Sequence, residues 1–298
     1  MSTAAQTKPG FQVWMLAARP RTLFAAFVPV VVGTSLAFAE GKFHPLAAFV
    51  ALAVSVLIQI GTNFTNDLYD FLKGADTSER VGPLRVLASG LVTPGEMKLA
   101  ISLCFGTAFL LGLYLVYLGG WFILLLGIFS ILAGLAYTAG PYPLAYNGLG
   151  DLFVFLFYGL IGTLGSYFVQ TLSFSTLAII ASVPVGALVT NILVVNNYRD
   201  IEQDKKAGKH TLAVKLGEAF SRYEYVILLT ASFAVPLILF LAYPVSPWVF
   251  LPYLTLPFGY KLVLMVFTLH GTQLNKALEL TAKFSALFGL LLSLGFVL

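Results

Sequence analysis

Long apolar runs separated by short polar segments make up most of this chain. About 20 predominantly apolar residues are enough for a helix to cross a bilayer. Nine runs meet this requirement approximately: 22–39, 46–66, 98–117, 121–138, 150–170, 177–196, 225–242, 249–268 and 282–298. The pattern predicts an all-α polytopic membrane protein in which residues 1–298 form a single domain, a bundle of nine transmembrane helices.

Composition agrees with this pattern and excludes a soluble domain. The mean hydropathy is +0.91, and 10% of residues are charged, whereas about a quarter are charged in soluble proteins. The net charge of +4 indicates membrane topology, not nucleic-acid binding, because the basic residues flank apolar runs. The single cysteine, Cys104, lies in an apolar run and is interpreted as a small buried hydrophobe.

The distribution of basic residues predicts the orientation in the membrane. Nine spans place the two ends of the chain on opposite sides. All 17 basic residues except Lys42 and Lys261 then fall on the side of the N-terminus or at its edge. Because positive loops stay in the cytoplasm, we expect this side to face the cytosol.

Two acidic stretches stand at the ends of the second and sixth runs, at 63–76 and 196–204. They hold six of the 13 acidic residues: Asp67, Asp70, Asp76, Asp200, Glu202 and Asp204. Four predicted helices separate the stretches, so both reach the same face of the bundle. Carboxylates near membrane depth are costly unless they bind something.

The spacing of these carboxylates suits a metal site. Asp67 and Asp70 are three residues apart, and Asp200 and Asp204 are four apart, so each pair shares one face if the helix continues. Asn63 lies on the same stripe, four residues before Asp67. Oxygen ligands without His or Cys suit Mg²⁺, which commonly bridges to phosphates. We therefore predict that these four aspartates bind Mg²⁺ and that the metal holds a diphosphate.

Basic residues on the same side could neutralise the remaining charge of a diphosphate. They are Arg21, Arg85, Arg199, Lys205 and Lys209. Arg85 lies in the loop 77–97, which we interpret as a cap over the site. The alternative, that acids and bases pair in solvated loops, explains one motif better than two matched ones. The chain has no P-loop and no GxGxxG, which argues against a nucleotide-driven machine.

These motifs resemble the UbiA superfamily of intramembrane aromatic prenyltransferases. The matching stretches are 19–22, 63–76, 80–90, 141–151, 196–217 and 274–281. The residues of these stretches are most similar to those of the branch that acts on 1,4-dihydroxy-2-naphthoate in menaquinone biosynthesis. One departure is Asp151, where the family pattern leads us to expect Glu; the charge is kept and the reach is shorter.

The resemblance implies a transferase of the cell inner (cytoplasmic) membrane with its active site facing the cytoplasm. It would move a polyprenyl group from an all-trans polyprenyl diphosphate to dihydroxynaphthoate, releasing CO₂ and diphosphate and giving demethylmenaquinol. Mg²⁺ is the implied cofactor, stabilising the departing diphosphate. The implied partners are the two substrates and membrane lipid, with no nucleic acid and no obligate protein partner.

The resemblance also implies roles for individual residues. Diphosphate binding falls to Asn63, Asn66, Arg85, Lys209, Arg21 and Arg199. Residues around the aromatic acceptor are Tyr142, Tyr146 and Asn197. A base must take the phenolic proton of the acceptor or keep it ionised. Both Asp70 and Asp76 qualify, and the sequence does not choose between them.

Three alternatives remain open. The acceptor could be 4-hydroxybenzoate, homogentisate or a porphyrin ring, although the wording of 80–90 and 196–217 argues against this. A cation or metabolite transporter would more often place its site at the midplane between broken helices. An inactive homologue acting as a membrane partner is disfavoured by the complete set of motifs.

Overall fold

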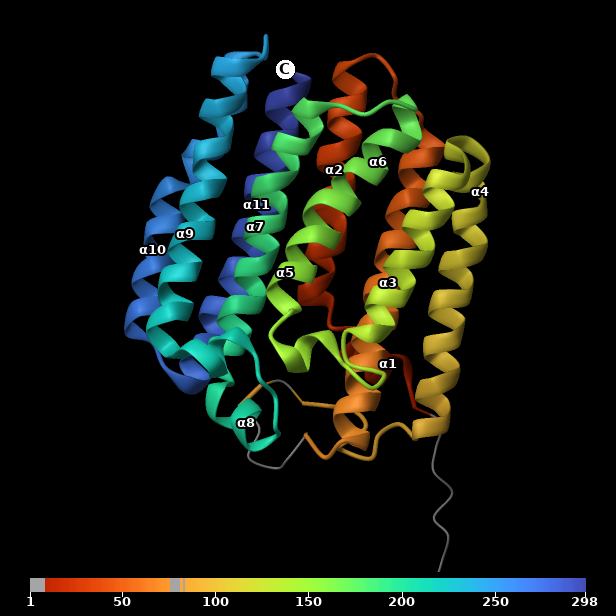
Figure 1. Cartoon of the computed structure of the whole chain (residues 1–298), viewed down its shortest axis with the longest axis vertical. Coiled ribbons are helices and arrows are strands. Elements are labelled where there is room, and N and C mark those ends of the chain that lie inside the picture. Colours follow the sequence, from red (N-terminus) through yellow and green to blue (C-terminus); the bar gives the residue numbers. More distant parts are fainter. Residues whose placement is uncertain (1–8, 76–80, 83) are drawn as a thin grey trace, which may run out of the picture.

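The computed structural model describes residues 9–75, 81–82 and 84–298, and that part of the chain contains helices and loops without strands. In chain order the elements are α1 (Phe11–Ala18), η1 (Pro20–Thr22), α2 (Leu23–Ala39), α3 (Pro45–Leu72), α4 (Pro94–Ala136), η2 (Leu144–Asn147), α5 (Gly150–Val154), η3 (Phe155–Ile161), α6 (Gly162–Thr171), α7 (Thr176–Arg199), α8 (Ile201–Lys206), α9 (Leu212–Ala242), η4 (Pro247–Thr255), α10 (Leu256–Thr268), η5 (Gly271–Gln273) and α11 (Leu274–Val297). The η elements are 3₁₀ helices except η3, which is a π-helix. Figure 1 shows them as one bundle, with α1 and α8 toward one end and the C-terminus at the other.

Seven helical segments of the described chain are long and apolar enough to span a membrane, and the bent pair α1 and α2 brings the number to eight. One of the seven is α4, whose 43 residues would measure about 65 Å if straight, twice the thickness of a hydrocarbon core. Gly120 interrupts it with φ 70° and ψ −164°. Figure 1 shows α4 as two legs joined at the top of the bundle. Because Gly120 separates the two legs, α4 corresponds to two of the predicted runs, 98–117 and 121–138. Residues from both legs line one cavity.

Several helices extend beyond their apolar runs. The length of an apolar run indicates how much of a helix lies in the hydrocarbon core, not where the helix ends. Helix α3 runs through the first acidic motif to Leu72, with the His44 side chain capping its N-terminus. By contrast, α7 ends at Arg199, and Asp200 separates it from the short helix α8. The expected continuous helix is therefore present at the first motif and broken at the second.

The main core lies between α2, α7, α9 and α11. Among its fully buried side chains are Tyr225, Phe284 and Phe288. Helix α7 is the most enclosed of the candidate spans, with 72% of its apolar window buried, whereas α4 has 11%. The central position of α7 brings the second acidic motif into the middle of one end of the bundle.

A close crossing sets the position of η3 against α7. The backbones of Gly159 and Gly186 approach so closely that a Cβ atom on Gly159 would lie 2.7 Å from the Cα atom of Gly186. Small residues allow this approach between membrane helices. Since η3 forms one wall of the cavity described below, the crossing also sets the width of that cavity.

We expect Gly159→Ala to lower the free energy of unfolding by about 1–3 kcal/mol, because backbone atoms cannot move aside as a side chain can. Thermal unfolding in detergent measures this. The control is Gly106→Ala in α4, where an added Cβ atom meets nothing within 4 Å. Equal melting temperatures for the two variants would show that the crossing is not close-packed.

Candidate active site

A cavity of about 410 Å³ lies between α2, α3, both legs of α4, the α5–η3–α6 segment and α7. At one end it is lined by carboxylates of both acidic motifs, Asp70, Asp200 and Asp204, and by two basic residues, Arg85 and Lys209. Toward the other end the lining is apolar: Ala51, Leu113, Val116, Leu126 and Val169. The volume is in the range of ligand pockets, and the gradient suits a ligand with a charged head and an apolar tail.

The first motif is buried because α3 continues through it. Asp67 and Asp70 are each 2% exposed, and Asn63 is 3% exposed. The amide of Asn63 donates to the Ala18 carbonyl at 2.9 Å and to the Thr22 hydroxyl at 3.1 Å. These bonds fasten α3 to the segment joining α1 and α2, so the orientation of the carboxylate face does not depend on α3 alone.

Arg85 reaches this face from the loop after α3. The loop is anchored by apolar side chains, including Val86 and Leu87, which pack against Ala18 and Leu68. Nη2 of Arg85 donates to Oδ2 of Asp70 at 2.9 Å. Its Nε lies 4.0 Å from Oδ1 of Asp67. The arginine predicted near the first motif therefore contacts it directly.

Lys209 joins the two motifs. Its Nζ lies 3.3 Å from Oδ1 of Asp70 and 3.7 Å from Oδ1 of Asp204. The hydroxyl of Tyr146 donates to Oδ1 of Asp70 at 2.7 Å, and the Tyr146 carbonyl accepts from the backbone N–H of His210 at 2.8 Å. The prediction that both motifs reach one face of the bundle is confirmed.

Arg199 holds the second motif from behind. Its Nε and Nη2 donate to the two carboxylate oxygens of Asp200 at 2.7 and 2.6 Å. Nη1 donates to Asn275 at 2.8 Å, and Nη2 also donates to Asn196 at 2.9 Å. The Arg199 side chain is 0% exposed and is not part of the cavity lining. Arg199, which the sequence predicts to bind diphosphate, therefore contacts Asp200 and helps to orient it.

Asp204 lies one helical turn after Asp200, although the helix axis breaks at Asp200. The Asp204 N–H donates to the Asp200 carbonyl at 2.8 Å. Both carboxylates line the cavity. The four-residue spacing therefore keeps them together, as the sequence predicts, although not on one continuous helix.

The other predicted residues fall into three groups. Asn66 and Asn197 line the cavity. Neither Tyr142 nor Tyr146 is part of the cavity lining, but Tyr142 is 62% exposed, whereas Tyr146 bonds to Asp70. Asp76 and the side chain of Arg21 lie outside the described parts of the structure.

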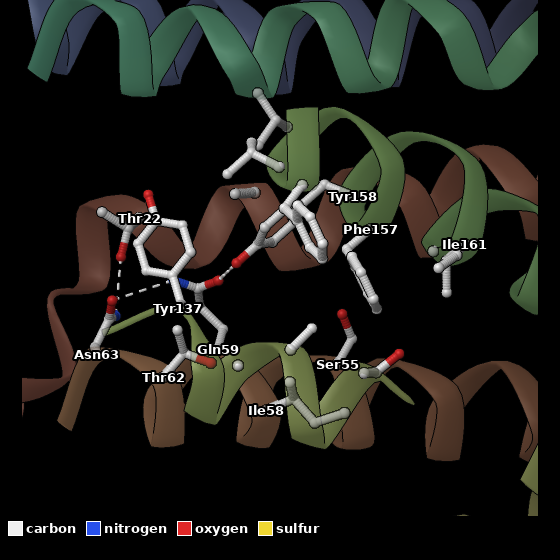
Figure 2. Close-up of a pocket in the computed structure, with 18 of the residues that line it drawn as sticks. Thr22, Ser55, Ile58, Gln59, Thr62, Asn63, Tyr137, Phe157, Tyr158 and Ile161 are labelled. Atoms are coloured by element: carbon white, nitrogen blue, oxygen red, sulfur yellow. Dashed lines mark hydrogen bonds between the residues drawn. The ribbon is translucent and has the colours of Figure 1, made fainter. Parts of the chain in front are cut away.

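Sequence reasoning missed a polar network deeper in the cavity (Figure 2). Gln59 and Tyr158 approach each other from α3 and η3, and the Tyr158 hydroxyl donates to Oε1 of Gln59. Nε2 of Gln59 donates to Oδ1 of Asn63 at 3.2 Å. A signal was available, because Gln59 precedes Asn63 by four residues on the stripe that carries Asp67. A polar side chain in an apolar span is a functional candidate.

The donor set fits a hard divalent cation. Among the described residues no group of three or more His, Cys, Asp or Glu side chains converges on one point. Mg²⁺ often takes only one or two carboxylates and completes its shell with water and substrate phosphate. Asp70, Asp200 and Asp204 supply such oxygens to one cavity. The residues present therefore suit Mg²⁺ bound together with a phosphorylated ligand.

Lys73 adds positive charge just beyond α3. Its Nζ donates to the Thr138 carbonyl at 2.8 Å and lies 4.3 Å from the centroid of the Tyr146 ring. Burial lowers the pKa of Lys73, the nearby Lys209 lowers it further, and Asp70 opposes both effects. Lys73 therefore adds a third cation, after Arg85 and Lys209, in the electrostatic environment of Asp70.

Comparison with known proteins identifies the family. A profile described as the UbiA prenyltransferase family matches residues 26–288. The chain belongs to this family. UbiA relatives include a 1,4-dihydroxy-2-naphthoate octaprenyltransferase of Escherichia coli (strain K12), 38% identical over 96% of both chains. One of the same name from Bacillus subtilis (strain 168) is 38% identical over 99% of this chain and 96% of the relative.

Solved UbiA structures share the fold. The apo structure of a UbiA homolog from Aeropyrum pernix K1 has a TM-score of 0.70 and 17% identity, covering 91% of this chain and 96% of the other. A UbiA homolog from Archaeoglobus fulgidus, bound to DMAPP and Mg²⁺, has a TM-score of 0.65 and 17% identity, covering 94% of this chain and 99% of the other. The resemblance seen in the UbiA motifs is therefore confirmed for the family and the fold.

We expect Arg199→Met to lower the free energy of unfolding by about 3–5 kcal/mol, because it leaves Asp200 buried without its cation. Adding Asp200→Asn should restore much of the loss by removing the uncompensated charge. Unfolding in detergent without substrates measures both. The control is Lys276→Met at an exposed position in α11. If the double variant were no more stable than Arg199→Met, the proposed role of Arg199 would be wrong.

Proposed function

We propose that this protein is a 1,4-dihydroxy-2-naphthoate polyprenyltransferase of menaquinone biosynthesis. It transfers a polyprenyl group from an all-trans polyprenyl diphosphate to the naphthoate and releases CO₂ and diphosphate, giving demethylmenaquinol. The observation that carries the proposal is the junction of two distant motifs at one cavity, where Lys209 contacts both Asp70 and Asp204. The relatives named for this activity match nearly the whole chain, which favours dihydroxynaphthoate over the other acceptors and over a transporter.

The protein is placed in the cytoplasmic membrane with nine spans and a site facing the cytosol. The two legs of α4, together with α2 and the six other candidate spans, support this number. The charged end of the cavity lies on the side that carries nearly all basic residues. The positive-inside rule then makes that side cytoplasmic.

The charged end binds the diphosphate. Asp67, Asp70, Asp200 and Asp204 would hold Mg²⁺, which when bound supplies electrostatic stabilisation to the departing diphosphate. Arg85 now pairs with Asp70 and Asp67, and Lys209 pairs with Asp70 and Asp204. Both side chains line the cavity and can therefore turn their positive charge to the diphosphate oxygens.

Asn66 also lines this end of the cavity and remains a candidate for diphosphate binding. The role of Asn63 is narrower. Its amide is bonded to Ala18, Thr22 and Gln59, so it orients α3 and the carboxylates on it. Arg199 acts similarly on Asp200.

The apolar end takes the prenyl chain and keeps water away from the reacting carbon. Phe157 and Tyr158 face the cavity from η3, and Tyr137 faces it from the end of α4 (Figure 2). Aromatic faces attract positive charge and so favour the allyl-cation-like transition state. The acceptor ring lies beside the charged end, with Asn197 and Tyr146 as its candidate contacts.

The metal ligands can be tested by conservative replacement. We expect Asp67→Asn and Asp204→Asn each to lower kcat/KM at least about 100-fold, since each removes charge that holds the cation at the departing diphosphate. Chelation with EDTA should abolish turnover of the wild-type protein. The control is Glu40→Gln, at the opposite end of the bundle. Both aspartate variants retaining wild-type activity would contradict the metal assignment.

The acceptor can be tested by turnover of purified protein in detergent with Mg²⁺ and all-trans prenyl diphosphates of several lengths. Dihydroxynaphthoate should give a prenylated naphthalenediol that lacks the carboxylate, formed only with metal. If only 4-hydroxybenzoate gave a product, the proposed diphosphate site would be supported, but the proposal that dihydroxynaphthoate is the acceptor would be wrong. Absence of product with every acceptor would contradict the proposed function.

A further inference from the structure

One buried carboxylate in the cavity has no part in the metal site described above. Asp151 lies in the first turn of α5 and is 6% exposed. It lines the same cavity as Asp70 and Asp200. No other residue in the described part of the chain donates a hydrogen bond to its carboxylate or forms an ion pair with it. A buried charge of this kind needs a partner, and the cavity is where a ligand can supply one.

Carboxylates of the two motifs are already held by neighbouring side chains. Asp70 binds Arg85, Lys209 and Tyr146. Asp200 holds Arg199 in a bidentate pair. The oxygens of Asp70 and Asp200 are therefore occupied by hydrogen bonds and ion pairs. No cation of the described chain forms an ion pair with Asp151.

Tyr137 relates the position of Asp151 to the charged end of the cavity. Tyr137 lines the cavity and interacts electrostatically with Asp151 and with Asp70 and Asp204 of the two motifs. The Tyr137 hydroxyl also lies 3.3 Å from the position of a Cβ atom on Gly150, the residue before Asp151. An aromatic acceptor of similar size, lying beside the diphosphate, would bring a ring hydroxyl within reach of Asp151.

Few other titratable groups face Asp151. Glu224 of α9 interacts with it electrostatically but is not part of the cavity lining. Lys215, also on α9, approaches the neighbouring Gly148 and donates to the Asn147 carbonyl at 2.9 Å. Among the described residues, a phenol and a second acid thus interact with Asp151, while the ammonium of Lys215 is bound to Asn147.

We propose that Asp151 is the general base that takes the hydroxyl proton of the aromatic acceptor. The assignment rests on the proposed prenyl transfer to a phenolic ring. It replaces the choice between Asp70 and Asp76 that the sequence leaves open.

The step balances without a net proton. The ring carbon that bears the carboxylate bonds to C1 of the prenyl chain, while the C1–O bond breaks and diphosphate leaves with its electron pair. The hydroxyl proton moves to Asp151 and the ring oxygen becomes a carbonyl. When CO₂ leaves, the electron pair of its C–C bond restores the aromatic ring, and Asp151 returns the proton to the carbonyl oxygen.

The test compares Asp151→Asn with the wild-type enzyme, full-length in detergent with Mg²⁺. We expect kcat to fall by about 10²–10⁴-fold, the usual contribution of a general base. The KM for prenyl diphosphate and the Mg²⁺ dependence should not change. The kcat of this variant should also rise about tenfold per pH unit below the pKa of a phenol, near 10, as the acceptor ionises without help. A merely structural role would not produce that slope.

Two further variants sharpen the comparison. Asp151→Glu keeps the carboxylate and should recover much of the lost kcat, while Glu224→Gln removes the neighbouring acid and should keep kcat near wild type. Wild-type kcat in Asp151→Asn, or loss of its prenyl diphosphate binding, would overturn the proposal.

Turnover by the wild-type protein tests the proposed function separately from the role of Asp151. If the wild type prenylates a phenol other than dihydroxynaphthoate, the same kcat comparison with that phenol decides the role of Asp151. If the wild type turns over no phenolic acceptor at all, both the function and the base are overturned.

Discussion

The contact of the Lys209 ammonium with Asp70 and Asp204 is the interaction on which the rest of this structure depends. Two helical segments from distant parts of the chain deliver carboxylates to one buried place. Without cations between them, like charges in a weakly polarisable interior would repel strongly. Lys209 and Arg85 offset this repulsion, so the bundle can close around the charged end of the cavity.

This arrangement also suits a metal-dependent ligand. The same carboxylates that pair with lysine and arginine can instead bind a divalent cation, and the released side chains carry charge that a diphosphate needs. Under the proposed function, the ligand-bound state would use the same set of charges in a second pairing. Arg199 differs, because all of its bonds run to Asp200, Asn196 and Asn275 and none points to the cavity.

Apolar packing positions these charges. Helix α7 is enclosed on most sides, and its crossing with η3 at Gly159 and Gly186 leaves no room for side chains. The loop that carries Arg85 is held by Val86 and Leu87 against the base of α3. Apolar contacts therefore hold the polar end in place, next to the apolar part of the cavity.

The sequence by itself determined the class of protein, the approximate spans, the family and the two acidic motifs. Hydropathy and motif spacing are local properties, and a membrane span or an Asn63-to-Asp70 stripe can be recognised from them. Only the tertiary structure separated Arg85, which contacts Asp70, from Arg199, which supports Asp200, and Tyr146 from the exposed Tyr142. It also showed Gln59 and Asp151 in the cavity wall. These distinctions depend on which helices pack together, and local sequence does not record the partner that a side chain meets across a bundle.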